Sequence, residues 1–125
     1  MINYLLVAIG GAIGALMRYG VGKGVDQIGI GTPAGTLFTN FTGSFILGLL
    51  LFSSERSGFL GERWKLFLAI GILGAYTTMS TFSFESVKLL EDKGFWTFLI
   101  YVGGTLLLVL LAIGLGKAGS YVLVK

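Results

Sequence analysis

The sequence predicts an all-α membrane protein with four transmembrane helices, the third of which is broken mid-membrane. Hydrophobic residues make up 54% of the 125 residues and charged residues only 12%, about half the share of charge that soluble domains carry. Several apolar runs approach the roughly 20 residues that a bilayer core requires of a helix. We expect helices over about 3–22, 34–53, 66–92 and 95–117, within a single transmembrane domain, residues 1–125.

The composition also excludes several classes of function. The chain has no cysteine and no histidine, which excludes disulfides, thiolate nucleophiles and histidine acid–base catalysis, so we expect no enzyme. The net charge of +3 comes from residues that mostly flank the apolar runs, which is typical of membrane-flanking charge. No basic stripe alternates with aromatic residues, so we expect membrane lipid and no nucleic acid as a partner. The first apolar run lacks the basic start of a signal peptide and is interpreted as a retained helix.

The first predicted helix carries close-packing signals and one charge. Gly10 and Gly14 form a G-x-x-x-G pattern, which indicates packing either within the bundle or against a second copy. A second face carries only small side chains: Ala8, Gly11, Ala12 and Ala15. We expect that face to contact another helix as well. Arg18 lies well inside the predicted span, where it either snorkels to the interface or lines an aqueous mouth.

The second predicted helix begins at the only proline, Pro33, which is favoured at a first helical position. Polar or small residues recur along it every four positions: Thr36, Asn40, Ser44 and Gly48. This stripe is expected to face protein or water, because the rest of the helix is apolar. The amide of Asn40 requires several hydrogen-bond partners in hydrocarbon, so it serves either as interhelical glue or as part of a polar path.

The third predicted helix contains the break, which we place near residues 75–80. Five of the seven residues from Thr77 to Ser83 carry hydroxyls, and an unsatisfied polar group in hydrocarbon costs several kcal/mol. Gly71, Gly74 and Ala75 come just before this run and let the helix unwind. Irregular backbone at such depth is tolerated only inside protein or beside water, so the break indicates an ion or substrate site.

Polar groups are few after the break. Glu85 stands three residues before Lys88, a spacing that permits a surface ion pair, although a functional role for the carboxylate is equally open. In the fourth predicted helix, Tyr101 and Thr105 lie one turn apart in an otherwise apolar segment.

The stretch from Gly71 to Glu85, G-I-L-G-A-Y-T-T-M-S-T-F-S-F-E, closely resembles the signature of the Fluc (CrcB) fluoride channels. The first-helix block that ends in Arg18 and the block G-T-L-F-T-N, which ends at Asn40, extend the resemblance over nearly the full length. The chain departs from the pattern at Met79, where the family has phenylalanine, at Ala75, where a second glycine is common, and at Val109, where a hydroxyl is expected.

This resemblance implies a passive fluoride-selective channel that exports fluoride from the cytoplasm through the plasma membrane of a prokaryote. It also implies an antiparallel dual-topology dimer with two pores and a central structural sodium ion, bound by the backbone carbonyls of Gly74 and Thr77. The residues expected to line the anion path are Asn40, Phe82, Met79, Ser80, Thr81, Thr36, Ser44, Tyr101, Thr105 and Arg18. Most of these are neutral hydrogen-bond donors, which can replace the water of fluoride without trapping it.

The sequence itself favours a dimer, because one small glycine-rich bundle leaves little room for a pore. About five basic residues fall on the N-terminal side and three on the other, too even a division to fix one orientation in the membrane. Three alternatives remain: a heterodimer with a paralogue, a non-transporting subunit, and a small dual-topology multidrug transporter. The last would need a glutamate in the first helix, and none lies between Asn3 and Gly22.

Overall fold

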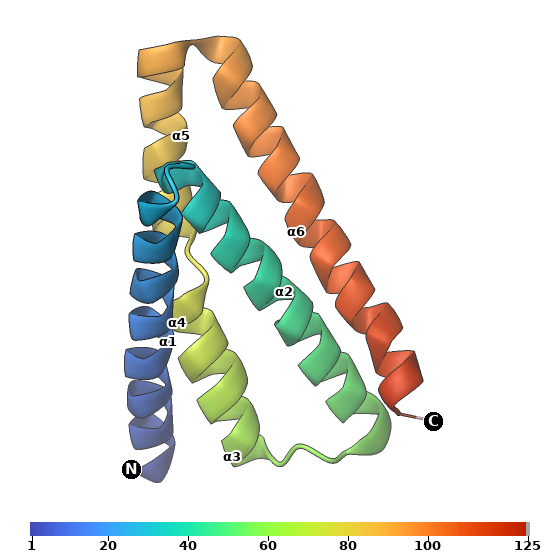
Figure 1. The fold of residues 1–125 in the computed structure, drawn as a ribbon. Coiled ribbons are helices and arrows are strands. Elements are labelled where there is room, and N and C mark those ends of the chain that lie inside the picture. The colour runs from blue at the N-terminus through green and yellow to red at the C-terminus, as the bar shows by residue number, and fades with distance from the viewer. Residues whose placement is uncertain (125) are drawn as a thin grey trace.

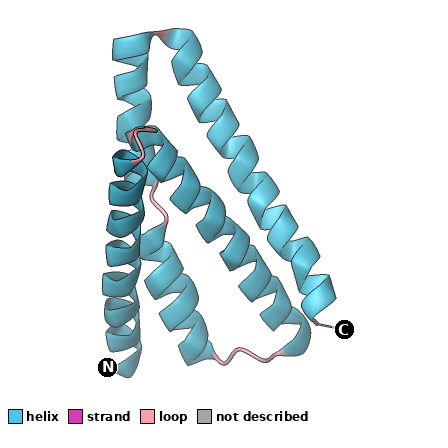
Figure 2. Ribbon diagram, in the orientation of Figure 1, coloured by secondary structure: helices cyan, strands magenta, loops and turns pink. Residues whose placement is uncertain are grey.

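The computed structural model describes residues 1–124, except for the side chain of Thr32. The described chain is helical, with short connections between helices (Figures 1 and 2). Its elements are α1 (Ile2–Gln27), α2 (Thr32–Ser57), α3 (Glu62–Lys65), η1 (Leu66–Leu73), α4 (Gly74–Tyr76), α5 (Met79–Lys93) and α6 (Phe95–Leu123). Four segments of the described chain are long and apolar enough to cross a membrane, and the third runs from Glu62 to Lys93 through the break. The prediction of four transmembrane helices is therefore confirmed.

Most helices are longer than the apolar runs suggest, because polar residues continue the helix beyond the hydrocarbon. Thus α1 ends at Gln27 and α2 at Ser57. Gly58 stops α2 in the left-handed region at φ 64°, where glycine carries no steric cost, and its N–H donates to the Ser54 carbonyl at 2.8 Å. Both described chain ends lie at one end of the bundle, while the α5–α6 hairpin extends beyond the α1–α2 turn at the other (Figure 1).

Glycines set how closely the helices approach one another. Gly10 and Gly14 are buried against η1, and a Cβ atom at Gly14 would collide with the carbonyl of Ile72. The G-x-x-x-G pattern therefore packs within the chain, one of the two roles predicted for it. Gly48 and Gly116 allow the same close approach between α2 and α6, since a Cβ atom at either would strike the backbone of the facing helix.

The second small face of α1 does not contact another helix of the same chain. Ala8, Ala12 and Ala15 are exposed, and space is open around Gly11. The prediction of a contact there is wrong for the single chain, because η1 packs against the neighbouring face that holds the two buried glycines.

The break falls where the sequence predicts it. The π-helix η1 leads into the short α4, and the backbone is then extended at Thr77 (φ −80°, ψ 157°) and Thr78 (φ −151°, ψ 122°). Thr78 is the N-cap of α5, because its Oγ1 accepts from the Thr81 N–H at 3.2 Å. The third spanning segment therefore consists of two helical parts joined by two extended residues.

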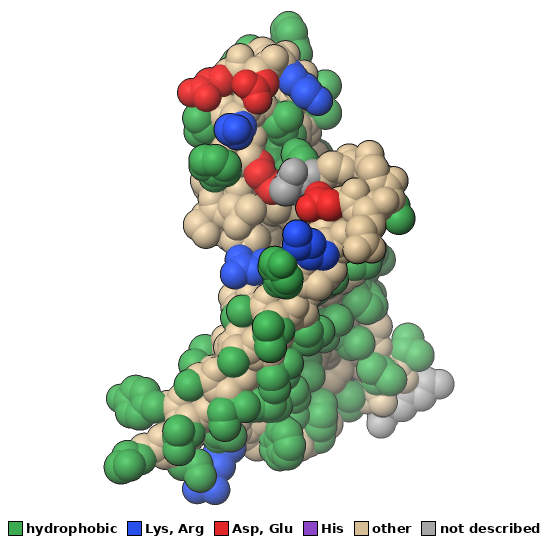
Figure 3. Space-filling model, turned by 60° about the vertical axis from the view of Figure 1, so that its left-hand side comes forward, with side chains coloured by type: hydrophobic (Ala, Val, Ile, Leu, Met, Phe, Trp, Pro, Cys, Tyr) green, Lys and Arg blue, Asp and Glu red, His purple; other side chains and the backbone are tan. Residues whose placement is uncertain are grey.

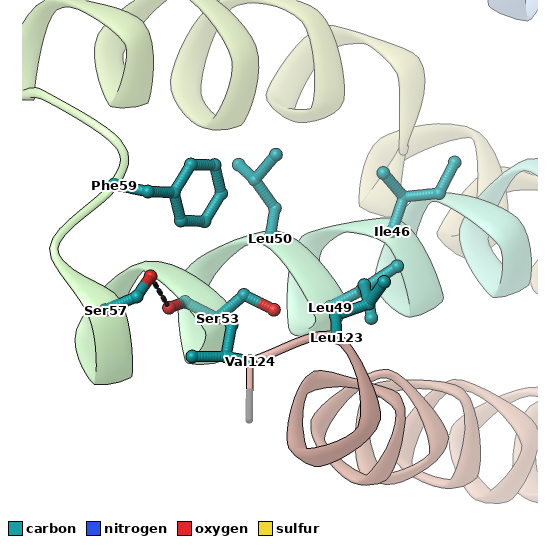
Figure 4. A pocket seen from close by; sticks show the side chains of 8 residues that line it. All are labelled: Ile46, Leu49, Leu50, Ser53, Ser57, Phe59, Leu123 and Val124. Carbon is teal, nitrogen blue, oxygen red and sulfur yellow. Dashed lines mark hydrogen bonds between the residues drawn. The ribbon is translucent and has the colours of Figure 1, made fainter.

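The surface and one of its hollows suit hydrocarbon. In Figure 3, hydrophobic side chains cover most of the lower part of the face, whereas most charged side chains gather in its upper part and a basic group lies at the lower edge. Near the C-terminal ends of α2 and α6, a mostly apolar hollow of about 540 Å³ is lined by Ile46, Leu49, Leu50, Ser53, Ser57, Phe59, Leu123 and Val124 (Figure 4). The Ser57 hydroxyl donates to the Ser53 carbonyl at 2.9 Å. None of the described residues that line the hollow carries a charge, so it is a poor candidate for an ion site.

Candidate functional site

Asn40 of α2 holds the extended backbone of the break. Its Nδ2 donates to the carbonyl of Thr78 at 3.0 Å, and the Thr78 N–H donates to Asn40 Oδ1 at 2.7 Å. The two hydrogen bonds form a closed pair between one side-chain amide and one backbone residue. Asn40 is therefore an interhelical link, one of the two roles predicted for it, and it also lines a polar hollow beside the break.

The hydrogen bonds around the break divert the N–H groups that would bind two backbone carbonyls in a continuous helix. In a continuous α-helix, the N–H of Thr78 would donate to the Gly74 carbonyl and that of Thr81 to the Thr77 carbonyl. Here the first N–H is bound by Asn40 and the second by the side chain of Thr78. Gly74 is exposed and Thr77 half-buried in the single chain. Neutral carbonyl oxygens of this kind are suitable ligands for a monovalent cation.

The first of two hollows that polar side chains help to line, of about 220 Å³, lies between α2, the break and α6, and most of its exposed wall is apolar. Its lining residues are Asn40, Ser44, Thr77, Thr78, Met79, Phe82, Thr105, Leu106 and Val109. Thr105 is 4% exposed, and its hydroxyl has no hydrogen-bond partner within the described chain. Asn40 retains a second amide N–H beside the one bound to Thr78. This hollow therefore offers neutral donors, and none of its described lining residues is charged.

A second polar hollow, of about 270 Å³, lies on the α1 side of the break. It is lined by Ala15, Arg18, Tyr19, Gly22, Gly35, Thr36, Thr39, Thr78, Thr81 and Glu85. Thr78, whose backbone is hydrogen-bonded to Asn40, lines both hollows and therefore lies between them. Arg18 is half-buried, and it supplies the cation of this hollow while Glu85 supplies the carboxyl group.

Glu85 is buried, with 7% of its surface exposed, and joins three helices. One carboxyl oxygen accepts from the Thr36 hydroxyl of α2 and the other from the Tyr101 hydroxyl of α6, both at 2.8 Å. The Tyr101 ring in turn packs on Phe82, with 5.4 Å between ring centroids. The ion pair suggested by the spacing of Glu85 and Lys88 is wrong, since Lys88 lies over the Phe84 ring on the outer face instead.

The helical period could have revealed this position of Glu85. Phe82, Glu85 and Ser86 follow one another at spacings of three and one, so they share one face of α5, and all three are buried. A carboxyl group on the same helix face as a buried aromatic residue points into the bundle. There it requires hydrogen-bond donors such as the Tyr101 hydroxyl.

The remaining candidate residues divide between the hollows and the surface. Ser44 is buried in the first hollow, and Thr81 lines the second, where its Oγ1 accepts from Thr78 Oγ1 at 3.0 Å. Met79 and Phe82 both line the first hollow, yet Met79 is 67% exposed and Phe82 only 6%. Ser80 is exposed and lines neither hollow. In a single chain, the start of α5 therefore presents polar and flexible side chains to its surroundings.

Comparison with known proteins agrees with the signature around the break. The sequence profile of the family described as "CrcB-like protein, Camphor Resistance (CrcB)" matches residues 5–117. The chain belongs to the CrcB family. The profile covers all four spanning segments, so the membership extends from α1 to the second half of α6 and includes both polar hollows.

Relatives from this CrcB family are similar over most of their length. The protein named "Fluoride-specific ion channel FluC 3" from Methanosarcina barkeri is 45% identical over 117 residues, 94% of this chain and 89% of the relative. One named "Fluoride-specific ion channel FluC" from a strain of Thermus thermophilus is 47% identical, over 91% of this chain and 90% of its own. Another, "Fluoride-specific ion channel FluC 1" from Listeria monocytogenes, is 41% identical, over 93% and 95%.

Proposed function

We propose that this chain forms a passive fluoride-selective channel in the plasma membrane of a prokaryote. The observation that carries the proposal is a pair of polar hollows that meet at Thr78 in the middle of a membrane-spanning helix. Relatives that are 41–47% identical are named as fluoride-specific channels, and they come from both archaea and bacteria, which supports the ion and the membrane.

The chemistry of the hollows supports a small, strongly hydrated anion. Fluoride accepts hydrogen bonds strongly, so a path across the membrane must replace its water with donors at close range. Asn40, Thr105 and Thr81 offer N–H and O–H groups without a positive charge that would hold the ion. Phe82 also lines the first hollow, and the edge of an aromatic ring carries a partial positive charge that can face an anion. Neutral donors favour both entry and release, which suits passive conduction.

The two charged residues of the second hollow, Glu85 and Arg18, have opposite effects on an anion. A carboxylate at Glu85 would repel an anion, but its oxygens accept from Thr36 and Tyr101, and Arg18 lines the same hollow. In this proposal, Arg18 attracts anions at the mouth of the path. Thr36 and Tyr101 hold the carboxyl group of Glu85 in one position.

The working unit in this proposal is an antiparallel homodimer with two pores. A single chain would expose the polar groups of Gly74 and Ser80 to hydrocarbon, where they are costly, and would leave the small face of α1 without a partner helix. A second copy packed across the break would cover them. The near-even division of basic residues between the two sides is compatible with insertion in both orientations.

A structural sodium ion at the centre of this dimer would be held by the carbonyls of Gly74 and Thr77 from both copies. The proposal is supported by the hydrogen bonds of the break. The N–H groups that would bind these carbonyls in a helix donate to Asn40 and to the Thr78 side chain instead, which leaves hard, neutral oxygen ligands at two residues that are not buried.

A heterodimer with a paralogue is the second candidate, and two positions favour it. Val109 lines the first hollow where a hydroxyl would extend the row of donors from Thr105, and Met79 stands in place of an aromatic ring. A paralogue could supply both missing groups.

One experiment separates the two candidates. The protein purified alone is reconstituted into liposomes loaded with fluoride or chloride, and efflux is followed with ion-selective electrodes. We expect fluoride efflux and no chloride efflux. Silence for both ions would favour the heterodimer, whereas comparable efflux of chloride would exclude fluoride selectivity.

A further inference from the structure

A small hollow at the end of the α2–α6 pair gathers charges that the ion path does not use. It measures about 200 Å³ and is lined by Phe52, Glu55, Arg56, Lys117, Ser120 and Tyr121. Two cations and one carboxylate thus share the site, which leaves one net positive charge. The hollow lies at the end of the bundle that holds both described chain ends, far along α2 and α6 from the break (Figure 1).

The two cations are positioned by a reciprocal pair of ring contacts. The Arg56 guanidinium of α2 lies 4.1 Å from the ring centroid of Tyr121 on α6, and Lys117 Nζ of α6 lies 5.0 Å from that of Phe52 on α2. Each helix therefore supplies one cation and the aromatic ring for the other cation. Such contacts restrain long side chains but leave their N–H donors available to an anion.

Close helix packing fixes the spacing of this arrangement. Ser120 is fully buried between the helices, with its hydroxyl donating to the Lys117 carbonyl at 2.6 Å, and Gly116 lies directly against the backbone of α2. Because the backbones approach so closely here, the cations of both helices reach the same hollow. Ser120 itself is not available to a ligand.

We propose that this hollow binds the phosphodiester headgroup of an anionic phospholipid. Lys117 lies six residues before the end of α6, roughly 9 Å along the helix axis, so its ammonium group can reach the headgroup level of the bilayer. Basic pockets between transmembrane helices are the sites that recognise acidic headgroups. Arg56, Lys117 and the Tyr121 hydroxyl supply the donors, and the single carboxylate of Glu55 disfavours a more highly charged anion.

The test compares lipid binding by two matched double variants. Full-length protein in neutral detergent is titrated with dioleoyl phosphatidylglycerol or phosphatidylcholine, and bound lipid is counted by native mass spectrometry. The wild type should retain phosphatidylglycerol in preference to phosphatidylcholine. R56Q/K117Q should weaken phosphatidylglycerol binding about tenfold or more, since each interfacial cation contributes to attraction of acidic lipid. R63Q/K65Q removes the same charge from α3, outside the hollow, and should keep the preference.

Three results would overturn the proposal. A wild type without preference, or equal losses in both double variants, would mean that the Arg56 and Lys117 contacts do not form a lipid site. Inorganic phosphate alone should not raise the thermal stability of the wild type; if it does so as much as phosphatidylglycerol, the hollow binds a free anion. Should R56Q/K117Q elute as an aggregate, Arg56→Lys keeps the charge, and it must retain the preference while Arg56→Gln reduces it.

Discussion

The side-chain amide of Asn40 takes both backbone groups of Thr78, with the N–H donating to Oδ1 at 2.7 Å and the carbonyl accepting from Nδ2 at 3.0 Å. A polar residue on one helix thus satisfies the irregular backbone of another at mid-membrane, where water cannot. The same contact withdraws the Thr78 N–H from the Gly74 carbonyl. One side chain therefore stabilises the break and frees a potential cation ligand.

Asn40→Ala should sharply reduce fluoride efflux and also destabilise the fold. The change removes the donors of the first hollow and leaves both groups of Thr78 unpaired, at about 1–3 kcal/mol for each buried group. Efflux from liposomes and thermal unfolding in detergent measure the two effects.

Ser44→Ala is the control for Asn40, since Ser44 lies one turn further along α2 in the same hollow. We expect a smaller loss of efflux and little change in stability. If Asn40→Ala destabilises the protein but conducts normally per folded dimer, Asn40 is a structural link alone.

Tyr101→Phe should lower stability by about 1–3 kcal/mol, because a buried carboxyl oxygen of Glu85 loses its donor. The ring remains, so its packing on Phe82 is retained. Thr36→Val removes the donor to the other oxygen and should have a similar effect. Tyr4→Phe, at a position 83% exposed, should change stability by less than about 0.5 kcal/mol. If Tyr101→Phe and Thr36→Val were as stable as the wild type and Tyr4→Phe, the hydrogen bonds to Glu85 would contribute nothing to the stability of the fold.

The sequence predicted the features that depend on local pattern. Hydropathy located the four spans, and the run of small residues before Thr77 located the break. The four-residue spacing of Thr36, Asn40 and Ser44 correctly placed one polar stripe toward the interior, where all three line a hollow. These signals can be found within a single segment of the sequence, because hydropathy, spacing and small residues are properties of the segment itself.

Features that depend on how helices pair could not be predicted in the same way. The helix α1 carries two faces of small residues, and which face packs depends on the approach of η1, which contacts Gly10 and Gly14. The partner of Asn40 is 38 residues away and exists only once α2 crosses the break. Burial of Glu85 likewise depends on donors from two other helices.

Sodium should stabilise the proposed dimer through the carbonyls of Gly74 and Thr77. Dimer content, measured by crosslinking or size-exclusion chromatography, should fall when sodium is replaced by N-methylglucamine. Thr77→Ser keeps the carbonyl and should preserve assembly, whereas Gly74→Val places a branched side chain on an exposed surface beside the break and should prevent it. An assembly insensitive to sodium would remove the ion from the proposal.

Both orientations should occur in the membrane. The chain has no cysteine, so a single Ser57→Cys substitution gives one label site at the end of α2. We expect an impermeant thiol reagent to label about half of the molecules from each side. Adding Lys23→Gln and Lys88→Gln increases the charge difference and should restrict labelling to one side. One-sided labelling of the parent variant would refute dual topology.

Met79, like Val109, lines the first hollow and departs from the pattern expected for the family, and its exposure differs from that of Phe82. Met79 is 67% exposed and Phe82 6%, so substitutions at the two positions carry unequal packing costs. Phe82→Ala would leave a cavity and lower the free energy of unfolding by about 3–5 kcal/mol. A loss of efflux in that variant could then reflect unfolding and not a loss of conduction. Phe82→Met keeps most of the volume and removes only the ring.

Exchange of side chains between these two positions therefore tests the role of the ring. A thioether lacks the positive ring edge that faces an anion, so Phe82→Met should lower fluoride efflux while the protein still elutes as a folded dimer. Met79→Phe should keep or raise efflux, because an exposed position beside the hollow accepts a ring without displacing the core. Efflux from liposomes at equal protein density measures both variants. If neither exchange alters the rate, these side chains do not face the ion, and the anion path does not run through the first hollow.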